Sequence, residues 1–294
     1  MNEFQSKAEF EEVAIELSID PAMAEKDWYV AQVLALLATV NISGYLIVFS
    51  GGTSLSKAHG LIKRFSEDID FKVLTEEKNP GRGVLSTFKH TLIKILEDAG
   101  FKIIPESIFA RDLNRFFSFH LEYRSHFAPL SGLRPHIQLE FTVSNTELKP
   151  VNRQAGSLLN QLKKAAPEVK QIACVDPIEI AADKLSALAW RIPKQESLEK
   201  SEDRSLVRHI HDLAALEKVV NENNDFRRLV LIALQTDNER NKEMALLSSM
   251  QKFNILLDTI TKNGKKYRAE YDTFVRGLSY AAEGEVPDYD TSTI

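Results

Sequence analysis

The stretch FSGGTSLSKAHGLIKRFSEDIDFKV, residues 49–73, decides how this chain folds. It begins where the apolar run Tyr45–Phe49 stops at two glycines, as expected of a buried strand that ends in a tight turn. It ends in DIDFKVL, residues 68–74, where polar and apolar residues alternate with the period of a strand. Between them a short helix is expected over Ser54–Gly60. The stretch therefore predicts a strand, a glycine turn, a short helix and a second strand, in that order.

Further elements are expected on both sides of this stretch. Upstream, residues 3–17 carry apolar residues at helical spacing, and Asp20-Pro21 is typical of a helix start, which predicts a second helix to about Thr39. Downstream, a helix is expected over Val84–Ala99. Three more strands are expected, over 101–104, 116–123 and 136–143.

Strand patterns stop at about residue 175, and the rest of the chain has the pattern of helices. Asp176-Pro177 opens one helix, Ser205–Val220 is another, and further helices are expected between 224 and 281. The tail from Glu283 has four acidic residues and no basic one, so it is expected to be loose. We therefore predict an α+β fold, with a mixed sheet flanked by helices over 1–175, a helical bundle over 176–282 and a flexible acidic tail over 283–294.

Composition excludes several classes of protein. The chain has 294 residues, of which 44% are hydrophobic and 27% charged, with a net charge of −5. The single cysteine, Cys174, excludes an internal disulfide and a Cys-rich zinc site and fits a reducing cytosol. The N-terminus has no apolar segment of the secretory kind. A charge-free run, Trp28–Ser56, is interrupted by polar residues and glycine, so we interpret it as helix, turn and buried strand rather than as a membrane span. A cytoplasmic protein without a membrane partner is expected.

The two acidic residues of DIDFKVL point to metal chemistry. Asp68 and Asp70 are two apart on an expected strand, so their side chains project from the same face. Carboxylates placed in this way suit two divalent cations about 4 Å apart, and Mg²⁺ prefers carboxylate and phosphate oxygens. In IQLEF, residues 137–141, the alternation places Glu140 on a polar face, where it is a candidate third ligand. We expect two Mg²⁺ ions held by these three residues.

The preceding turn suits phosphate binding. The backbone of Gly51-Gly52 and the hydroxyl of Thr53 can approach phosphate oxygens at a helix start. Candidate cations follow in Lys57, Lys63 and Arg64. Each feature alone also fits an ordinary structural role, such as a common glycine turn, a solvated strand face or surface charge. Their conjunction is the layout of the polymerase-beta-type nucleotidyltransferase fold, although the interval from Gly52 to Asp68 is long for that pattern.

The histidines do not suggest a zinc site. His209 and His211 are two apart on an expected helix, so their side chains project from different faces. The chain also lacks the nucleophile-elbow, Walker A and Rossmann motifs.

At this point the chain resembles a known family. GGTSLSKAHGLIKRFSEDIDF resembles the leading motif of the AbiEii/AbiGii (MenT-like) nucleotidyltransferase toxins of bacterial toxin–antitoxin systems. AEKDWYVAQVLALL, residues 24–37, resembles the entry helix of that family, with its signature at Glu25–Trp28. DPIEIAADKLSALAWR resembles the segment with an acid–lysine pair, here Asp183-Lys184, and VRHIHDLAAL resembles the helix with Arg208 and Asp212-Leu213. The resemblance covers about residues 22–216. Many relatives have an acid where His209 stands and an aromatic residue at His211.

The resemblance implies a role for each matching residue. Gly51, Gly52 and Thr53 hold the triphosphate of an NTP, and Asp68 and Asp70 bind Mg²⁺. Lys184 contacts the triphosphate or the charge of the transition state, and Asp212 orients Lys184 or Arg208. Without the family, Lys184 and Asp212 would be read as a lysine with its stem on apolar surface and a surface acid of a helix. The full set of expected nucleotide-binding residues is Gly51, Gly52, Thr53, Lys57, Arg64, Ser66 and Arg208.

The expected reaction is the transfer of a nucleoside monophosphate from an NTP to an acceptor hydroxyl, with release of pyrophosphate. The resemblance implies that the acceptor is the 3′ end of tRNA, so that translation is blocked, and that a cognate antitoxin is a partner. Residues 225–268 carry nine Lys or Arg against five Asp or Glu, which suits RNA but equally suits a solvated helical face. Two alternatives stay open: nucleotidylation of a protein or small molecule by the same site, and a non-catalytic NTP-binding toxin that sequesters a partner.

Overall fold

The computed structural model describes residues 5–130, 133–198, 206–238, 245–281 and 284–292. The chain divides into two compact units, and the boundary follows Val175. The first unit comprises Met1–Gly60 and Phe65–Val175, and the second comprises Leu61–Arg64 and Asp176–Ile294. The short segment Leu61–Arg64 thus belongs with the second unit although it interrupts the first in sequence.

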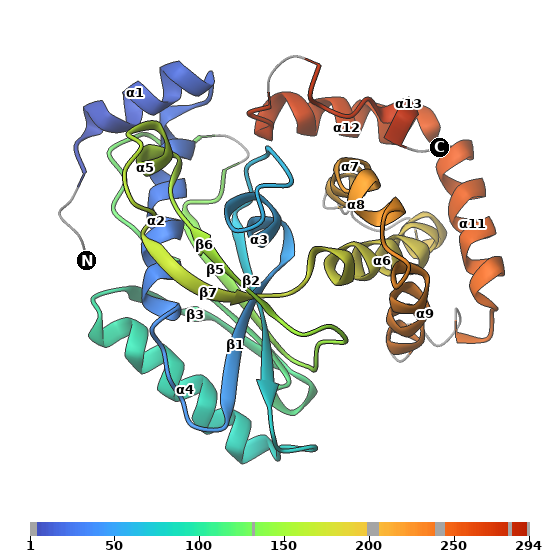
Figure 1. The fold of residues 1–294 in the computed structure, drawn as a ribbon, viewed down its shortest axis with the longest axis horizontal. Helices are drawn as coiled ribbons and strands as arrows, with labels where there is room; N and C mark the ends of the chain where they lie inside the picture. Colours follow the sequence, from blue (N-terminus) through green and yellow to red (C-terminus); the bar gives the residue numbers. More distant parts are fainter. Residues whose placement is uncertain (1–4, 131–132, 199–205, 239–244, 282–283, 293–294) are drawn as a thin grey trace. The chain divides into compact units, whose positions relative to one another are not determined.

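The first unit is built on one seven-stranded mixed sheet (Figure 1). Its strands follow the order β3-β4-β5-β2-β1-β7-β6. The strands are β1 (Tyr45–Ser50), β2 (Asp68–Thr75), β3 (Lys102–Arg111), β4 (Phe116–Glu122), β5 (His136–Val143), β6 (Val151–Ala155) and β7 (Val169–Cys174). The helices are α1 (Lys7–Leu17), α2 (Pro21–Leu37), α3 (Gly51–Lys57), α4 (Arg82–Asp98), α5 (Leu158–Leu162) and the 3₁₀ turn η1 (Asp112–Asn114).

The expected order of a strand, a helix and a second strand over residues 45–75 is confirmed as β1, α3 and β2. The predicted turn is wrong, because the two glycines are the first residues of α3, which begins at Gly51 and ends at Lys57 rather than covering Ser54–Gly60. β1 and β2 pair antiparallel, whereas β2 pairs parallel with β5. The expected start of α2 is also confirmed, because Asp20 accepts a hydrogen bond from the backbone of Ala22 at 2.8 Å and Pro21 is the first helical residue.

Strands β6 and β7 were not predicted, and β3 is longer than expected. In β6 the three middle residues are exposed, and in β3 most residues from Pro105 on are exposed. Both lie at the edges of the sheet. Such strands lack a buried face, so they show no apolar alternation that a sequence pattern could detect.

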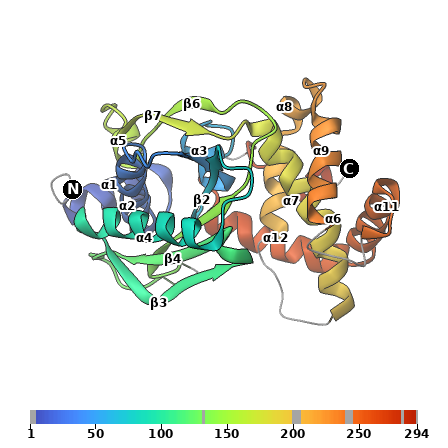
Figure 2. The same cartoon turned by 90° about the horizontal axis from the view of Figure 1, so that it is seen from below.

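The apolar face of the sheet is a row of aromatic rings. Phe49, Phe71, Phe141 and Phe117 occupy paired positions on four neighbouring strands. Their ring centroids follow one another at 5.7, 5.1 and 4.9 Å. All four are buried, and each contributes about 1.5–3 kcal/mol by removal from water. Helix α4 covers this face (Figure 2). The ring of Phe88 on α4 lies 6.1 Å from that of Phe117.

The opposite face carries the polar residues of the same strands. Ser50, Asp70, Glu140, Ser118 and Phe109 are paired across five strands, from β1 to β3. Since paired residues point to the same side of a sheet, these five side chains form one cross-strand row. The alternation that buries one face therefore presents the acidic residues on the other.

The regular elements described in the second unit are helices. They are α6 (Pro177–Leu198), α7 (Leu206–Ala215), α8 (Glu217–Asn221), α9 (Phe226–Asp237), α11 (Ser249–Lys262), α12 (Gly264–Leu278) and α13 (Tyr289–Ser292). The predicted α+β fold, a mixed sheet flanked by helices and followed by further helices, is confirmed. None of the helices in the described ranges combines the length and apolar character needed to cross a bilayer.

The acidic tail differs from the expectation. The structure describes residues 284–292, and they pack within the second unit rather than remaining loose. Tyr289 is 4% exposed and its ring lies 5.6 Å from that of Tyr271, whose hydroxyl donates to the carbonyl of Pro287 at 2.7 Å. The acidic composition of the tail gave no indication that Tyr289 would be buried.

Candidate active site

The acidic residues of β2 and β5 lie side by side. Asp68 and Asp70 project from the polar face of β2, and Glu140 is paired with Asp70 on β5. Gln138 is paired with Asp68 in the same way. The prediction that Glu140 lies on a strand next to the two aspartates is thus confirmed.

Gly51 allows Asp70 to approach the start of α3. Its φ of +72° lies in the left-handed region, which side chains other than hydrogen disfavour. A Cβ at Gly51 would also overlap the carboxylate of Asp70. Glycine is therefore required at this position for two independent reasons, one of backbone conformation and one of space.

Thr53 connects α3 to β2. Its hydroxyl, in a residue 1% exposed, donates to the main-chain carbonyl of Asp68. The expected phosphate ligand therefore holds the first residue of the acidic strand. Ser66, also expected to bind nucleotide, is half-buried two residues before Asp68.

Arg134 belongs to this cluster and was not predicted. Its Nη1 donates to Asp68 Oδ1 at 2.5 Å and to Gln138 Oε1 at 2.6 Å. Gln138 in turn donates to Glu140 Oε1 at 2.5 Å. One guanidinium thus connects, directly or through Gln138, two of the three expected metal ligands.

The main chain of Arg134 is held by a buried ion pair. Glu67 Oε1 accepts from Lys26 Nζ at 2.8 Å and from the backbone N–H of Arg134 at 2.6 Å. Lys26 Nζ also donates to the carbonyl of Arg134 at 2.9 Å. Burial alone would raise the pKa of Glu67, but Lys26 and the Arg134 N–H outweigh it and lower the pKa. Arg134 is therefore fixed at both its N–H and its C=O.

The other charges of the Glu25-Lys26-Asp27 triplet hold further segments. Glu25 accepts from the backbone N–H of His126 at 2.9 Å. Asp27 accepts from Lys57 Nζ at 2.5 Å and from the backbone N–H of Leu158 at 2.7 Å. Lys57, an expected nucleotide ligand, is thus only 7% exposed in its side chain and is paired with Asp27. Three consecutive charges in an otherwise uncharged helix were the sequence signal for this network.

The donor atoms of the acidic cluster are of the kind that Mg²⁺ prefers, namely carboxylate oxygens on one face. Burial and the charge of Asp68 raise the pKa of Glu140, as expected where carboxylates are crowded. Within the described ranges, no three His, Cys, Asp or Glu side chains are gathered so as to hold a metal ion. Asp68 and Glu140 are instead engaged by Arg134 and Gln138. The residues fit a divalent cation by chemistry, and their present hydrogen bonds would have to change.

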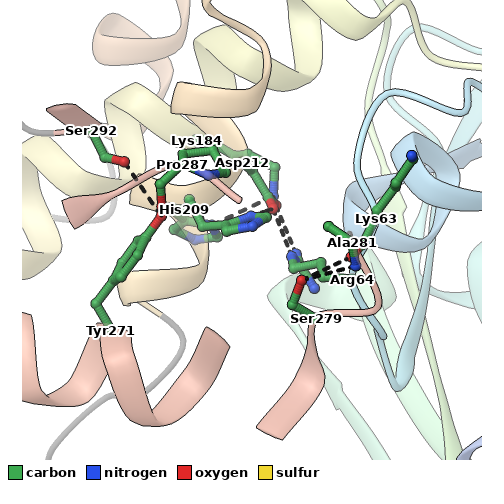
Figure 3. Close-up of polar contacts among 11 residues, drawn as sticks. Lys63, Arg64, Lys184, His209, Asp212, Tyr271, Ser279, Ala281, Pro287 and Ser292 are labelled. Atoms are coloured by element: carbon green, nitrogen blue, oxygen red, sulfur yellow. Dashed lines mark hydrogen bonds and ion pairs between the residues drawn. The ribbon is translucent and has the colours of Figure 1, made fainter. Parts of the chain in front are cut away.

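A second cluster lies within the second unit and centres on Asp212 (Figure 3). Asp212 accepts from Arg64 Nε at 2.6 Å and from Arg64 Nη2 at 2.7 Å, and Lys184 Nζ lies 2.9 Å from Asp212 Oδ2. The side chains of Asp212, Arg64 and Lys184 are 0%, 3% and 8% exposed. Burial alone would raise the pKa of Asp212, but Arg64 and Lys184 outweigh it and hold the pKa well below its usual range.

The residues around Asp212 complete this cluster. His209 lies between Lys184 Nζ, 3.5 Å from its Nδ1, and Arg191 Nη1, 3.3 Å from its Nε2. Burial and these two cations hold the pKa of His209 well below its usual value, so the imidazole is neutral at pH 7. The Arg208 guanidinium lies over the ring of Phe274 at 5.9 Å. Asp212 therefore pairs with Lys184 and with Arg64.

The predicted site residues thus fall into two groups. The first unit holds Gly51, Gly52, Thr53, Lys57, Ser66, Asp68, Asp70 and Glu140. The second holds Lys63, Arg64, Lys184, Arg208 and Asp212. Lys63 pairs there with Glu285 at 2.7 Å and is half exposed.

Comparisons with known proteins place this chain in a family. No curated protein matches it. Among solved structures it is similar to MenT4, a nucleotidyltransferase toxin from Mycobacterium tuberculosis H37Rv, at 15% sequence identity and a TM-score of 0.41, over 92% of this chain and 99% of that chain. The model of the family described as nucleotidyl transferase AbiEii toxin, type IV toxin–antitoxin system, matches residues 35–291. The chain therefore belongs to the AbiEii family of nucleotidyltransferase toxins.

Proposed function

We propose that this protein uses Mg²⁺ to transfer a nucleoside monophosphate from an NTP to the 3′ end of tRNA, which blocks translation. The observation that carries the proposal is the pairing of Asp70 with Glu140 on neighbouring strands, with Asp68 on the same face and Gly51 against Asp70. Carboxylates in this arrangement beside a helix that opens with two glycines suit a metal-dependent transfer of a phosphoryl group.

Asp68, Asp70 and Glu140 are the residues that would hold two Mg²⁺ ions. When bound, such ions lower the pKa of an attacking hydroxyl and stabilise the charge of the leaving pyrophosphate. The role of Thr53 is to hold Asp68 through its main chain, and Gly51 lets the carboxylate of Asp70 approach the start of α3. The backbone of Gly51-Gly52 is proposed to bind the triphosphate there. Ser66 is proposed to bind the same triphosphate.

The cluster around Asp212 is proposed to neutralise phosphate charge. The three side chains of Arg64, Lys184 and Asp212 together carry a net charge of +1. His209 beside them is neutral. Asp212 holds both cations in place, so little side-chain freedom is lost when an anion binds. Lys184 is assigned to the transferred phosphate and Arg208 to the triphosphate.

The family and the local charge support the proposed acceptor and partner. The basic stretch 225–268 supports an RNA acceptor, and a toxin of this family implies a cognate antitoxin. Nucleotidylation of a protein or a small molecule by the same site is the second candidate.

The proposal is tested by incubating the protein with Mg²⁺, total bacterial tRNA and each α-labelled NTP in turn. The double variant Asp68→Ala/Asp70→Ala is compared with Asp98→Ala, which removes an exposed acid at the end of α4. Label in tRNA with wild type and Asp98→Ala, but not with the double variant, is the expected result. Label on protein would move the acceptor to the second candidate. Wild-type transfer by a folded double variant would refute the metal assignment.

A further inference from the structure

The hairpin formed by β3 and β4 exposes aromatic and apolar side chains at its tip. Phe109 is 53% exposed and Leu113 is 60% exposed, although both are large and apolar. The guanidinium of Arg111 lies over the ring of Phe116 at 4.3 Å, and the rings of Phe109 and Phe116 meet edge to face at 6.2 Å. We call Phe109, Arg111 and Phe116 the hairpin platform.

The hairpin platform lies on the same face of the sheet as the acidic residues. Phe109 is paired with Ser118, which is paired with Glu140, which is paired with Asp70. Phe109 is therefore three strands from Asp70, about 14 Å at the usual strand spacing. That distance is the length of about four stacked nucleotides at about 3.4 Å each.

The hairpin platform joins the acidic cluster along one face of the sheet. Arg111 is paired with Phe116, which stands two residues before Ser118 and therefore points to the same face of β4, and Ser118 is paired with Glu140. The platform is thus continuous with the proposed transfer site rather than a separate patch.

The tip of the hairpin is held in a rarely populated backbone conformation. Asp112, Leu113 and Asn114 have φ values of 48°, 54° and 68°, in the left-handed region that non-glycine residues rarely adopt. Asn114 is 8% exposed, and Lys89 of α4 donates to its Oδ1 at 3.2 Å. The tip is therefore pre-organised by α4, as expected of a surface that binds a ligand without reordering.

We propose that the hairpin platform binds the single-stranded end of the RNA acceptor, with bases stacked on Phe109 and Phe116 and a phosphate paired with Arg111. This inference rests on the proposed function. Exposed aromatic rings together with a guanidinium are the means by which proteins bind single strands, because every base offers a face for stacking. The distance to the acids lets a bound strand of a few nucleotides place its terminal hydroxyl at Asp70.

The inference is tested by fluorescence anisotropy with a short labelled RNA that carries the 3′ sequence of tRNA. Phe109→Ala is expected to weaken RNA binding about fivefold or more, which matches the loss of one base stack. Arg111→Gln removes the phosphate contact and is expected to weaken RNA binding as well, and more strongly at low salt. The control is Ile15→Ala, which removes an apolar side chain that is 81% exposed on α1. In the transfer assay the first two variants should raise KM for tRNA and leave kcat and NTP affinity unchanged.

Three results would overturn the inference. Unchanged RNA affinity in both platform variants, with tRNA still labelled by wild type, would refute the platform and leave the proposed function standing. Unchanged RNA affinity with a loss of neutralisation by the antitoxin would make the platform a protein-docking surface. Failure of the wild-type protein to bind or label any RNA would remove the proposed acceptor and the platform together.

Discussion

Asp212→Asn tests the balance of charges in the second unit. The substitution keeps the size of the side chain but removes the carboxylate that contacts both Arg64 and Lys184, at 2.6, 2.7 and 2.9 Å. Two cations that are 3% and 8% exposed then lose their counter-ion in a site that water barely reaches. Removal of one partner of a buried ion pair costs about 3–5 kcal/mol, so the free energy of unfolding should fall by about that amount.

The assay is urea unfolding followed by tryptophan fluorescence. The chain has two tryptophans, one in each unit, so Trp28→Phe leaves Trp190 as the reporter of the second unit. With a urea m-value of about 2 kcal/mol/M, the midpoint should fall by about 1.5 M or more. Asp258→Asn is the matched control, because it makes the same change of charge at an exposed position of α11.

A double variant separates the charge effect from a packing effect. Lys184→Met removes one of the two buried cations that Asp212 contacts, so Lys184→Met/Asp212→Asn should be more stable than Asp212→Asn alone. If Asp212→Asn unfolded at the same urea concentration as Asp258→Asn, the buried pair would contribute nothing measurable and our account of this cluster would be wrong.

Further predictions concern backbone, buried charge and pH. Gly51→Ala should abolish transfer and lower the Tm, because φ at Gly51 is +72° and the new Cβ would overlap the carboxylate of Asp70. Gly81→Ala is the control: a Cβ at Gly81 would have no neighbour within 4 Å, so transfer and Tm should stay unchanged. Lys26→Met should lower the stability of the first unit by about 3–5 kcal/mol, and adding Glu67→Gln should restore part of it; additive losses in urea unfolding would contradict the pairing. The pKa of Asp212 is lower in the folded protein than in the unfolded chain, where it is about 3.9. The ionised Asp212 therefore contributes its full stabilisation above about pH 3.9, and this contribution is lost as the pH falls through the lower pKa of the folded state. Wild type should therefore lose stability below about pH 4, measured by Tm, by more than Asp212→Asn does.

Much of the acidic half of the site was predictable, because strand alternation is a local property. DIDFKVL and IQLEF each bury one face, so the side of the sheet to which Asp68, Asp70 and Glu140 point follows from a few consecutive residues. The importance of Gly51 was recognisable for the same reason, since it directly follows an apolar strand and opens a helix.

Arg134 was not predictable, because nothing in its own neighbourhood distinguishes it from a surface arginine. Its place beside Asp68 depends on main-chain hydrogen bonds to Glu67 and Lys26, which are 67 and 108 residues away in sequence. The edge strand β6 was missed because it has no buried face that would impose alternation.

Periodicity and turn residues act over short distances, so local patterns in the chain suffice for the order of the elements in residues 45–75, the α+β class and the face that carries the carboxylates. Which distant residues meet depends on the tertiary fold. Asp70 and Glu140 became neighbours through parallel pairing of β2 with β5. Arg64 stands four residues before Asp68, yet it packs with the second unit and binds Asp212, 148 residues away. Buried charges require partners, and those partners can come from any part of the chain that the fold brings near.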